Sequence, residues 1–451
     1  MKSLNPHQTD FGRSPKTLHR VLVVSPHFPP VNAPDHQRIR TALPYLQEFG
    51  WETHILAVHP DQVPHPQDPN LAKLLPAHVP VTRTPALPAR YTQRFGLGNV
   101  GWRCLPYFAK AGDRLLAQGG FDLVFFSTTI FPVMTLGRRW LHRFGIPYVL
   151  DFQDPWRSDY QHKLGTQPPG GQLKYRMTQL LANICEPRAM RRVDQVISVS
   201  PAYPRTLQSH YPWLQDEQFT VLPFGAPESD FRQLASLNIQ QTLFNPKDGK
   251  RHWVYVGRGG SDMAIALRAL FLAIRQVCEC HPNLRQIIHL HFVGTSYAPP
   301  HLTVKTIEPI AHDCGIADLV TEHPSRIPYF EAQQVLVDSD AILLIGSDDP
   351  SYTASKLYPC ILAQKPILAV VHEQSSVVDI MRHCQAGQVI TFNTTTGTDH
   401  LVRSLLPHIQ TLAISPEMQP QTNWDAFQPY TAREMTRKLC AVFDRSFVNH
   451  G

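Results

Sequence analysis

Short runs of β-branched and aromatic residues recur along the chain, and a stretch with helical spacing of its apolar residues follows nearly every one. In the first half these runs lie at residues 21–24, 53–58, 123–126, 148–150 and 196–199. Such alternation is typical of βαβ units, in which parallel strands form a sheet that helices cover on both faces. The chain is therefore predicted to be an α/β protein.

A second series of the same kind follows in the other half of the chain. Its runs lie at residues 253–257, 287–293, 341–345, 367–371 and 388–391. Because 451 residues exceed what one hydrophobic core supports, we expect two similar α/β domains, at residues 19–225 and 251–428, joined by a polar linker at 226–250. Open parallel sheets bind ligands beyond the carboxyl ends of their strands, so two facing sheets predict a ligand-binding cleft.

Both ends of the chain differ from these domains. Residues 1–18 are polar and contain neither an apolar segment nor a small-residue cleavage site, so they are predicted to be a disordered lead-in and not a secretory signal. At the other end, the capping-box spacing of residues 431–434 predicts a helix within residues 429–451. The apolar residues of this helix share one face, at positions 435, 439, 442 and 443.

The composition of the chain limits the cellular compartments and the binding partners that can be expected for it. No apolar run approaches the roughly 18 residues that span a bilayer. The eight cysteines are scattered without metal-site spacing, which predicts a cytoplasmic protein with reduced thiols. The net charge of +6 comes without dense runs of lysine and arginine, so no nucleic-acid partner is expected. Nucleoside diphosphates or acidic lipid headgroups suit this modest positive charge.

The connection after the first strand of the second domain carries groups that can bind phosphate. Gly257, Arg258 and Gly259 lie between a predicted strand and a predicted helix. Free backbone amides of the glycines and the guanidinium of Arg258 can meet a diphosphate at this point. A glycine turn with a solvated arginine is the alternative.

A later connection in the same domain, at residues 348–356, has the same character. It places Thr353, Ser355 and Lys356 at the start of a predicted helix. Two hydroxyl groups and an ammonium group at a helix start can bind phosphate, so these residues are the strongest single prediction of a site. The alternative is a helix cap with an exposed lysine.

Several segments follow one another along the chain in an order and spacing that carry a resemblance. They are the loop SPHFPP at 25–30 with Gln37-Arg38 after it, and residues 146–156, 193–200, 221–225 and 355–366. Together they resemble the bacterial retaining glycosyltransferases of family four, which have the GT-B fold. The resemblance extends from about residue 20 to the end of the chain.

This resemblance implies two Rossmann-like domains that face each other across a cleft, with a final helix that crosses back to the first domain. It implies that the first domain receives the acceptor and that the second holds a nucleoside-diphosphate sugar, with a UDP-sugar expected. The departing diphosphate accumulates negative charge, which Arg258, Lys356 and helix amides can stabilise. Both residues are therefore expected in a catalytic role, and neither a metal ion nor a further cofactor is expected.

The chain departs from the family at positions that its relatives use for catalysis. A pair of glutamates falls on Ser351 and Pro359, and a histidine falls on Gln153. We expect Gln153 and its neighbour Asp154 at the catalytic position, where Asp154 orients an acceptor hydroxyl or acts as a base. Asp151 is a candidate for contacting the acceptor. Carboxylates in turns are commonly structural, which is the alternative for both aspartates.

Two other segments complete the expected site. Arg326, Ile327 and Tyr329 lie where the resemblance places the nucleobase, and Tyr329 either stacks on uracil or belongs to the core. In the proline-stiffened loop after the first strand, His27 and Asn32 can hydrogen-bond an acceptor sugar. A structural role is the alternative for His27.

Two groups of arginines lie on predicted helices of the first domain, at positions 138, 139 and 143 and at positions 188, 191 and 192. They face anionic lipid or a lipid-diphosphate acceptor, or they belong to a solvated helix face. The resemblance thus implies a metal-independent, hexosyltransferase-like glycosyltransferase that acts with retention. Its expected acceptor is a glycan or glycolipid, in polysaccharide biosynthesis at the inner face of the cell membrane. A nucleotide-sugar epimerase of the same fold and a non-catalytic nucleotide-sugar-binding protein are the alternatives.

Overall fold

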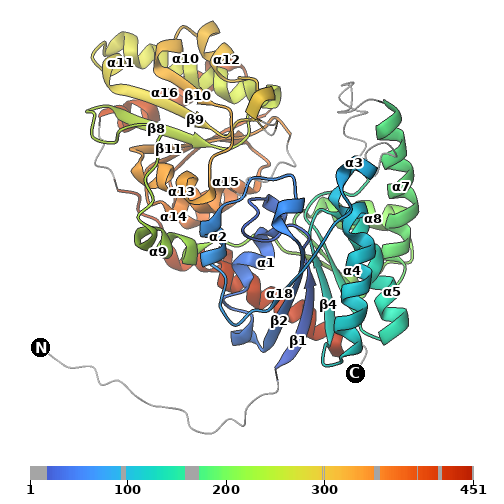
Figure 1. Ribbon diagram of the computed structural model, residues 1–451. Helices are drawn as coiled ribbons and strands as arrows, with labels where there is room; N and C mark the ends of the chain where they lie inside the picture. Colours follow the sequence, from blue (N-terminus) through green and yellow to red (C-terminus); the bar gives the residue numbers. More distant parts are fainter. Residues whose placement is uncertain are drawn as a thin grey trace, which may run out of the picture.

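The computed structural model describes residues 18–92, 98–157, 172–296, 298, 300–349, 356–393, 395–414 and 419–448. Figure 1 shows two α/β domains, one above the other, with the end of the chain returning to the first domain. Residues 1–17, which hold nearly all of the predicted lead-in, lie outside the described residues. None of the described helices is long and apolar enough to cross a membrane.

The first domain contains a sheet of seven parallel strands in the order β3-β2-β1-β4-β5-β6-β7. The strands are β1 (His19–Val24), β2 (Trp51–Val58), β3 (Val81–Thr84), β4 (Leu123–Ser127), β5 (Tyr148–Phe152), β6 (Gln195–Ser198) and β7 (Phe219–Val221). The strand order reverses between β1 and β4, which is where sheets of this topology bind their ligands.

Helices cover both faces of this sheet. The helices of this domain are α1 (Gln37–Ala42), α2 (Pro69–Lys73), α3 (Ala89–Thr92), α4 (Val100–Ala117), α5 (Thr135–Phe144), α7 (Gln172–Met190) and α8 (Ala202–His210). Every residue of β4 and β5 is buried, so their near-continuous apolar runs follow from covering on both faces. The short helix α1 ends two residues before Pro44, as the proline predicts.

The second domain repeats the topology with six parallel strands in the order β10-β9-β8-β11-β12-β13. The strands are β8 (Arg251–Val256), β9 (Ile288–Val293), β10 (Val320–His323), β11 (Ala341–Ile345), β12 (Ile367–His372) and β13 (Gln388–Phe392). The helices are α10 (Ala264–Cys280), α11 (Leu284–Ile287), α12 (Glu308–Asp313), α13 (Tyr329–Asp338), α14 (Leu357–Leu362), α15 (Ser376–Cys384) and α16 (Thr398–Ile414). The predicted pair of Rossmann-like domains is confirmed.

The last helix of the chain completes the core of the first domain. After α17 (Trp424–Phe427), the helix α18 (Ala432–Val448) packs Leu439 and Phe443 into the cluster that contains Val21 and Val23 of β1. Figure 1 shows α18, in red, lying along the sheet of the first domain. The predicted return of the final helix is confirmed, because its apolar face covers one face of this sheet.

The two segments that cross between the domains lie side by side. The amide of Ala226 donates to the carbonyl of Tyr430 (2.7 Å), and the amide of Ala432 donates to the carbonyl of Ala226 (2.9 Å). A Cβ atom at Gly225 would lie 2.6 Å from the Cα atom of Ala432, so only glycine allows this approach. Within residues 226–250, the helix α9 (Glu228–Leu237) follows the first crossing.

A buried polar network ties the domains together at the base of the cleft. Arg40 of α1 forms an ion pair with Asp230 of α9 at 2.7 Å. The hydroxyl of Tyr329, at the start of α13, donates to Asp230 (2.6 Å) and accepts from Arg40 (3.1 Å). The amide of Tyr329 donates to Asp68 of the first domain at 3.1 Å. One tyrosine therefore connects the second domain to three points outside it.

Candidate active site

A cleft opens between the carboxyl ends of the two sheets. Its larger part, of ≈ 670 Å³, is lined by both domains, and a narrower slot of ≈ 250 Å³ extends from it into the second domain. The residues that line both parts are Asn32, Arg258, Arg326, Tyr329, Lys356 and Pro359. Most of the predicted donor-binding side chains in the described residues therefore gather in one place.

The glycines after β8 do not offer their amides to the cleft. The amide of Gly257 donates to the carbonyl of Val293, and the amide of Gly259 donates to the carbonyl of Thr295, both at 2.8 Å. The predicted free amides are occupied because the loop continues the pairing of β8 with β9. Gly257 instead provides space: a Cβ atom there would lie 2.0 Å from the Nζ atom of Lys356. The side chain of Lys356 therefore occupies the space that a side chain at position 257 would need.

Lys356 follows β11 and lies across the end of β8. Its Nζ donates to the hydroxyl of Tyr255 at 3.3 Å and lies 5.3 Å from the centre of that ring. Burial, together with the positive charges of Arg258 and Arg326, lowers the pKa of Lys356 to about 7. An anion bound at this point would favour the charged ammonium form.

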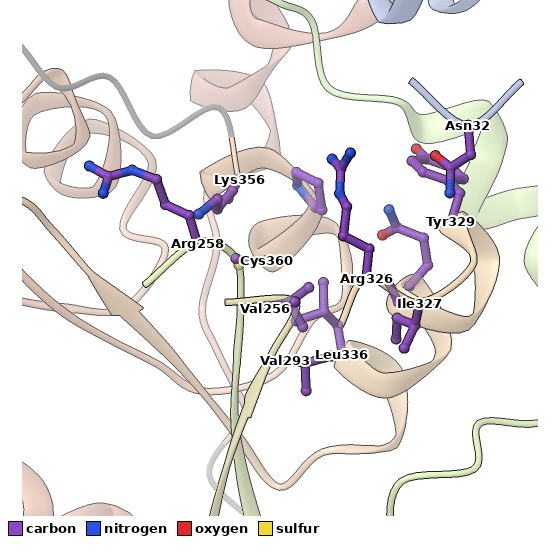
Figure 2. Close-up of a pocket in the computed structure, with 15 residues that line it drawn as sticks. Asn32, Val256, Arg258, Val293, Arg326, Ile327, Tyr329, Leu336, Lys356 and Cys360 are labelled. Carbon is purple, nitrogen blue, oxygen red and sulfur yellow. The ribbon is translucent and has the colours of Figure 1, made fainter. Parts of the chain in front are cut away.

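Two arginines accompany this lysine. Arg258 forms a bidentate ion pair with Asp262, with distances of 3.0 and 2.6 Å. Figure 2 shows Lys356 between Arg258 and Arg326, with Tyr329 and Asn32 on the other side of the pocket. Three cationic side chains thus approach the cleft from the second domain, which makes this wall suited to a polyanion such as a diphosphate.

The slot beside these cations is largely apolar. Val256, Val293, Ile327 and Leu336 line it, and Figure 2 shows them grouped together below Arg326. Tyr329 also lines the slot, but the guanidinium of Arg40 lies 4.8 Å from the centre of its ring. Tyr329 therefore belongs both to the polar network between the domains and to the wall of the slot.

The opposite wall of the cleft comes from the end of β5 in the first domain. Gln153 and Asp154 line the larger cavity together with Tyr203. Asp154 is accessible from the cleft, and the surrounding protein together with the charge of Asp35 raises the pKa of its carboxyl group. Gln153 is held in place, because its Nε2 donates to the carbonyl of Asp35 at 3.0 Å.

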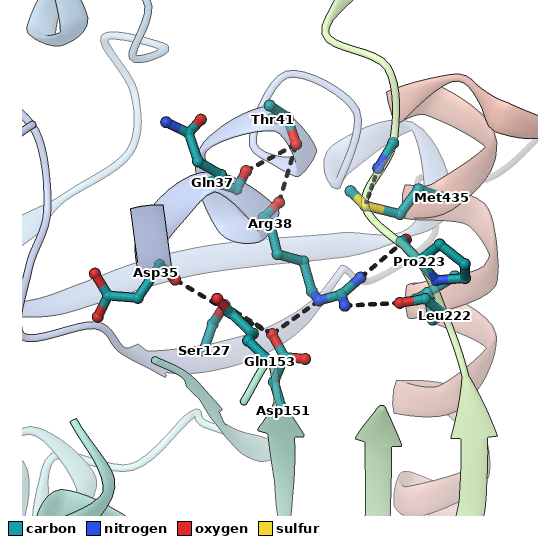
Figure 3. A network of polar contacts seen from close by, with 11 residues as sticks. Asp35, Gln37, Arg38, Thr41, Ser127, Asp151, Gln153, Leu222, Pro223 and Met435 are labelled. Carbon is teal, nitrogen blue, oxygen red and sulfur yellow. Dashed lines mark hydrogen bonds and ion pairs between the residues drawn. The ribbon is translucent and has the colours of Figure 1, made fainter. Parts of the chain in front are cut away.

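Asp151 does not reach the cleft, although it was expected to contact the acceptor. It is fully buried, and the Nε atom of Arg38 donates to its carboxylate at 2.8 Å. Arg38 also donates to the carbonyls of Leu222 (2.7 Å) and Pro223 (3.3 Å), as Figure 3 shows. The aspartate is thus the counter-ion of an arginine that fixes the first crossing segment.

The two residues predicted from the loop after β1 lie in different environments. Asn32 lines both parts of the cleft. His27 is only 5% exposed, and its Nδ1 atom contacts the carboxylate of Asp35 at 3.0 Å. The loop therefore presents the asparagine to the cleft and buries the histidine, so the structural alternative describes where His27 lies.

Some of the predicted positions lie outside the described residues, and one has no polar side chain. Thr353, Ser355 and Ser351 lie outside the described residues. Pro359, which replaces the second glutamate of the family, lines both parts of the cleft without a polar side chain. Within the part of the chain that the structure describes, no group of three or more histidine, cysteine or acidic side chains is arranged to hold a metal ion.

Comparison with known families gives a match in the first domain. Residues 36–225 match the family model described as a glycosyl transferase 4-like domain. No curated protein sequence matches the chain. The matched residues include the helix α1, Gln153 and Asp154, which the first domain contributes to the cleft.

Solved structures match over nearly the whole chain. Alr3699/HepE from Anabaena, solved with UDP and glucose, is 14% identical with a TM-score of 0.54, covering 94% of this chain and 99% of its own. A glycosyltransferase from Rickettsia africae is 12% identical with a TM-score of 0.54, covering 96% and 99%. A UDP-forming α,α-trehalose-phosphate synthase from Burkholderia xenovorans is 12% identical with a TM-score of 0.56, covering 96% and 99%. At this level of identity the similarity is one of fold.

Proposed function

We propose that this chain, which has the GT-B fold and carries a glycosyl transferase 4-like domain, transfers a sugar from a nucleoside-diphosphate sugar to an acceptor hydroxyl. The observation that carries the proposal is the approach of Arg258, Arg326 and Lys356 to one wall of a cleft between two Rossmann-like domains. UDP-sugars are the proposed donors, and the UDP named in the solved relatives supports this choice.

The cationic wall would stabilise the leaving group. As the bond between sugar and phosphate breaks, negative charge accumulates on the departing diphosphate while the sugar becomes oxocarbenium-like. Arg258 is held by its ion pair with Asp262, and Lys356 by its hydrogen bond to Tyr255, so both groups are positioned before the bond breaks. Because Arg326 and Lys356, together with Arg258 of the Arg258–Asp262 pair, can offset this charge, we propose that transfer does not depend on a metal ion. Unchanged activity in excess chelator is the expected result.

Asp154 is the proposed acceptor contact at the reacting centre. Its carboxylate lies on the wall opposite the cations, beside Gln153 and Tyr203. A carboxylate in this position can accept a hydrogen bond from the attacking hydroxyl and orient it. We propose transfer with retention, in which the leaving phosphate takes the acceptor proton; this route needs no glutamate at Pro359.

We also propose that the acceptor is a glycan or glycolipid and that the protein contacts an anionic membrane. The helix α7 exposes Met177 (38%), Leu180 (59%) and Ile184 (40%) along one side, and Arg188 follows them on the same side. An apolar stripe that ends in arginine suits the surface of anionic lipid. The cluster at 138–143 is partly neutralised, because Arg139 and Arg143 both pair with Asp113. Equal recovery of the protein with neutral and anionic vesicles would contradict membrane contact.

The decisive experiment incubates purified protein with candidate nucleotide sugars, with and without a membrane extract. Nucleotide release that depends on the acceptor supports transfer, an interconverted donor indicates an epimerase, and binding without turnover indicates a binding protein. The Lys356→Ala variant is expected to bind UDP at least tenfold more weakly, because it loses one charge-assisted contact of about 1.5–3 kcal/mol. Unchanged affinity by calorimetry would refute the role of Lys356.

A further inference from the structure

A buried glutamine lines the apolar slot, and its amide oxygen has no hydrogen-bond partner in the part of the chain that the structure describes. Gln333 lies one helical turn after Tyr329 on α13, is only 4% exposed, and lines the slot. Its Oε1 atom is buried without a hydrogen-bond partner among the described residues. By contrast, the neighbouring Gln334 donates from its Nε2 to the carboxylate of Asp338 at 2.7 Å.

An unpaired amide oxygen in a protein interior is unfavourable, and most buried polar atoms in folded proteins have a partner. The slot wall next to Gln333 consists largely of aliphatic side chains such as Val293 and Leu336. These side chains cannot hydrogen-bond to it. A ligand that enters the slot is therefore the available source of a partner for this amide.

The order of groups along the cleft identifies the part of the ligand. The cations Arg258 and Lys356 lie at the rim that the slot shares with the larger cavity. If they hold a diphosphate, one side of the ligand extends into the slot and the other into the polar cavity. A sugar carries hydroxyl groups around its ring that all need partners, whereas a nucleobase has two apolar faces and one polar edge. The base fits the slot, and its edge fits Gln333.

We infer that Gln333 reads the edge of the donor nucleobase, an inference that rests on the proposed function. An amide places an acceptor beside a donor, so it can form two parallel hydrogen bonds with a base edge. Because the unpartnered atom is the acceptor Oε1, the complementary edge is a ring N–H beside a carbonyl. Uracil and guanine have such an edge; cytosine and adenine have no hydrogen on the corresponding ring nitrogen. Gln333 is thus a specificity-determining residue.

Calorimetric titration of the full chain with UDP, GDP, CDP and inorganic pyrophosphate tests this inference. The wild-type protein should bind UDP or GDP at least about tenfold more tightly than CDP, and the comparison of UDP with GDP shows which base is read. Gln333→Met keeps the side-chain length and removes both hydrogen-bonding groups. It should weaken the preferred diphosphate by roughly 5- to 150-fold and leave pyrophosphate within about twofold.

Matched measurements separate this role from a structural one. Gln334→Met, on the adjacent position of the same helix, should leave all four affinities unchanged. The melting temperature of Gln333→Met should not fall, because the variant removes a buried amide oxygen that has no partner among the described residues. Equal loss of UDP and pyrophosphate binding, unchanged UDP binding, or a large fall in melting temperature would each overturn the inference. Failure of the wild-type protein to bind pyrophosphate and every nucleotide would instead overturn the proposed function together with it.

Discussion

Binding of a nucleoside diphosphate is expected to take up a proton at Lys356. In the empty cleft, burial and the charges of Arg258 and Arg326 lower the pKa of this lysine to about 7. A bound diphosphate reverses the balance, because an opposite charge beside the ammonium group favours its charged form. Above pH 7, the lysine must therefore gain a proton before or during binding.

The size of the effect follows from the two pKa values. With a pKa of about 7 in the empty protein and a value near that of free lysine, about 10.4, in the complex, roughly one lysine in eleven is charged at pH 8 before binding. Uptake is then about 0.9 proton per site at pH 8. The affinity should fall with rising pH, by about 50-fold between pH 7 and pH 9. The stability of the empty protein changes in the opposite direction over this range, because the unfolded chain binds the proton that the folded chain lacks.

Calorimetry with UDP in buffers of different ionisation enthalpy measures this proton directly. The terminal phosphate loses its last proton near pH 6, so the ligand itself contributes little above pH 7. Lys356→Arg is the matched variant, because an arginine stays charged at every pH used and should show neither proton uptake nor the slope. Absence of proton uptake by the wild-type protein at pH 8, or an equal slope in the arginine variant, would refute the reasoning.

Two further predictions concern Asp151 and Gly225, which stabilise the fold, each compared with a second position. Asp151→Asn should lower the unfolding free energy by about 3–5 kcal/mol, because it leaves Arg38 buried without a counter-ion. Asp154→Asn should change the unfolding free energy by less than about 1 kcal/mol and lower transfer without weakening UDP binding. Urea titration measures the stabilities and turnover assays measure transfer; equal stabilities of the two variants would contradict the assignment. Gly225→Ala should cost about 1–3 kcal/mol, since its methyl group meets the backbone of the second crossing segment, while Gly397→Ala, with nothing within 4 Å of its Cβ position, serves as the control; a stable Gly225 variant would show that the crossings can separate.

The fold could be read from the sequence wherever strands are buried on both faces. The pattern missed β3, β7 and β10, and each of these strands lies at the edge of its sheet. Most of their residues are partly buried or exposed, so they carry mixed polar and apolar side chains and no continuous apolar run. The central strands needed such runs because helices cover them on both sides.

The sequence could predict which strand ends form the site, but it could not predict which side chains point into the cleft. Sequence placed Asp151 and Asp154 at the end of β5, and only the structure shows that the first points into the core and the second into the cleft. The partner that decides this, Arg38, lies 113 residues earlier in the chain. Gln333 was missed because a lone glutamine on a helix gives no signal of burial, and its unpaired oxygen is a property of three-dimensional packing.

The helix α18 also has a consequence for how the chain is made. One face of the first sheet is closed by residues that are synthesised long after the rest of the first domain, since Leu439 and Phe443 complete the cluster around Val21. At roughly 5–20 residues per second, the intervening stretch of about 200 residues takes roughly 10–40 s to synthesise. During that time a strip of aliphatic side chains on the nascent first domain stays uncovered. The growing polypeptide therefore offers chaperones a defined hydrophobic target until α18 has been synthesised.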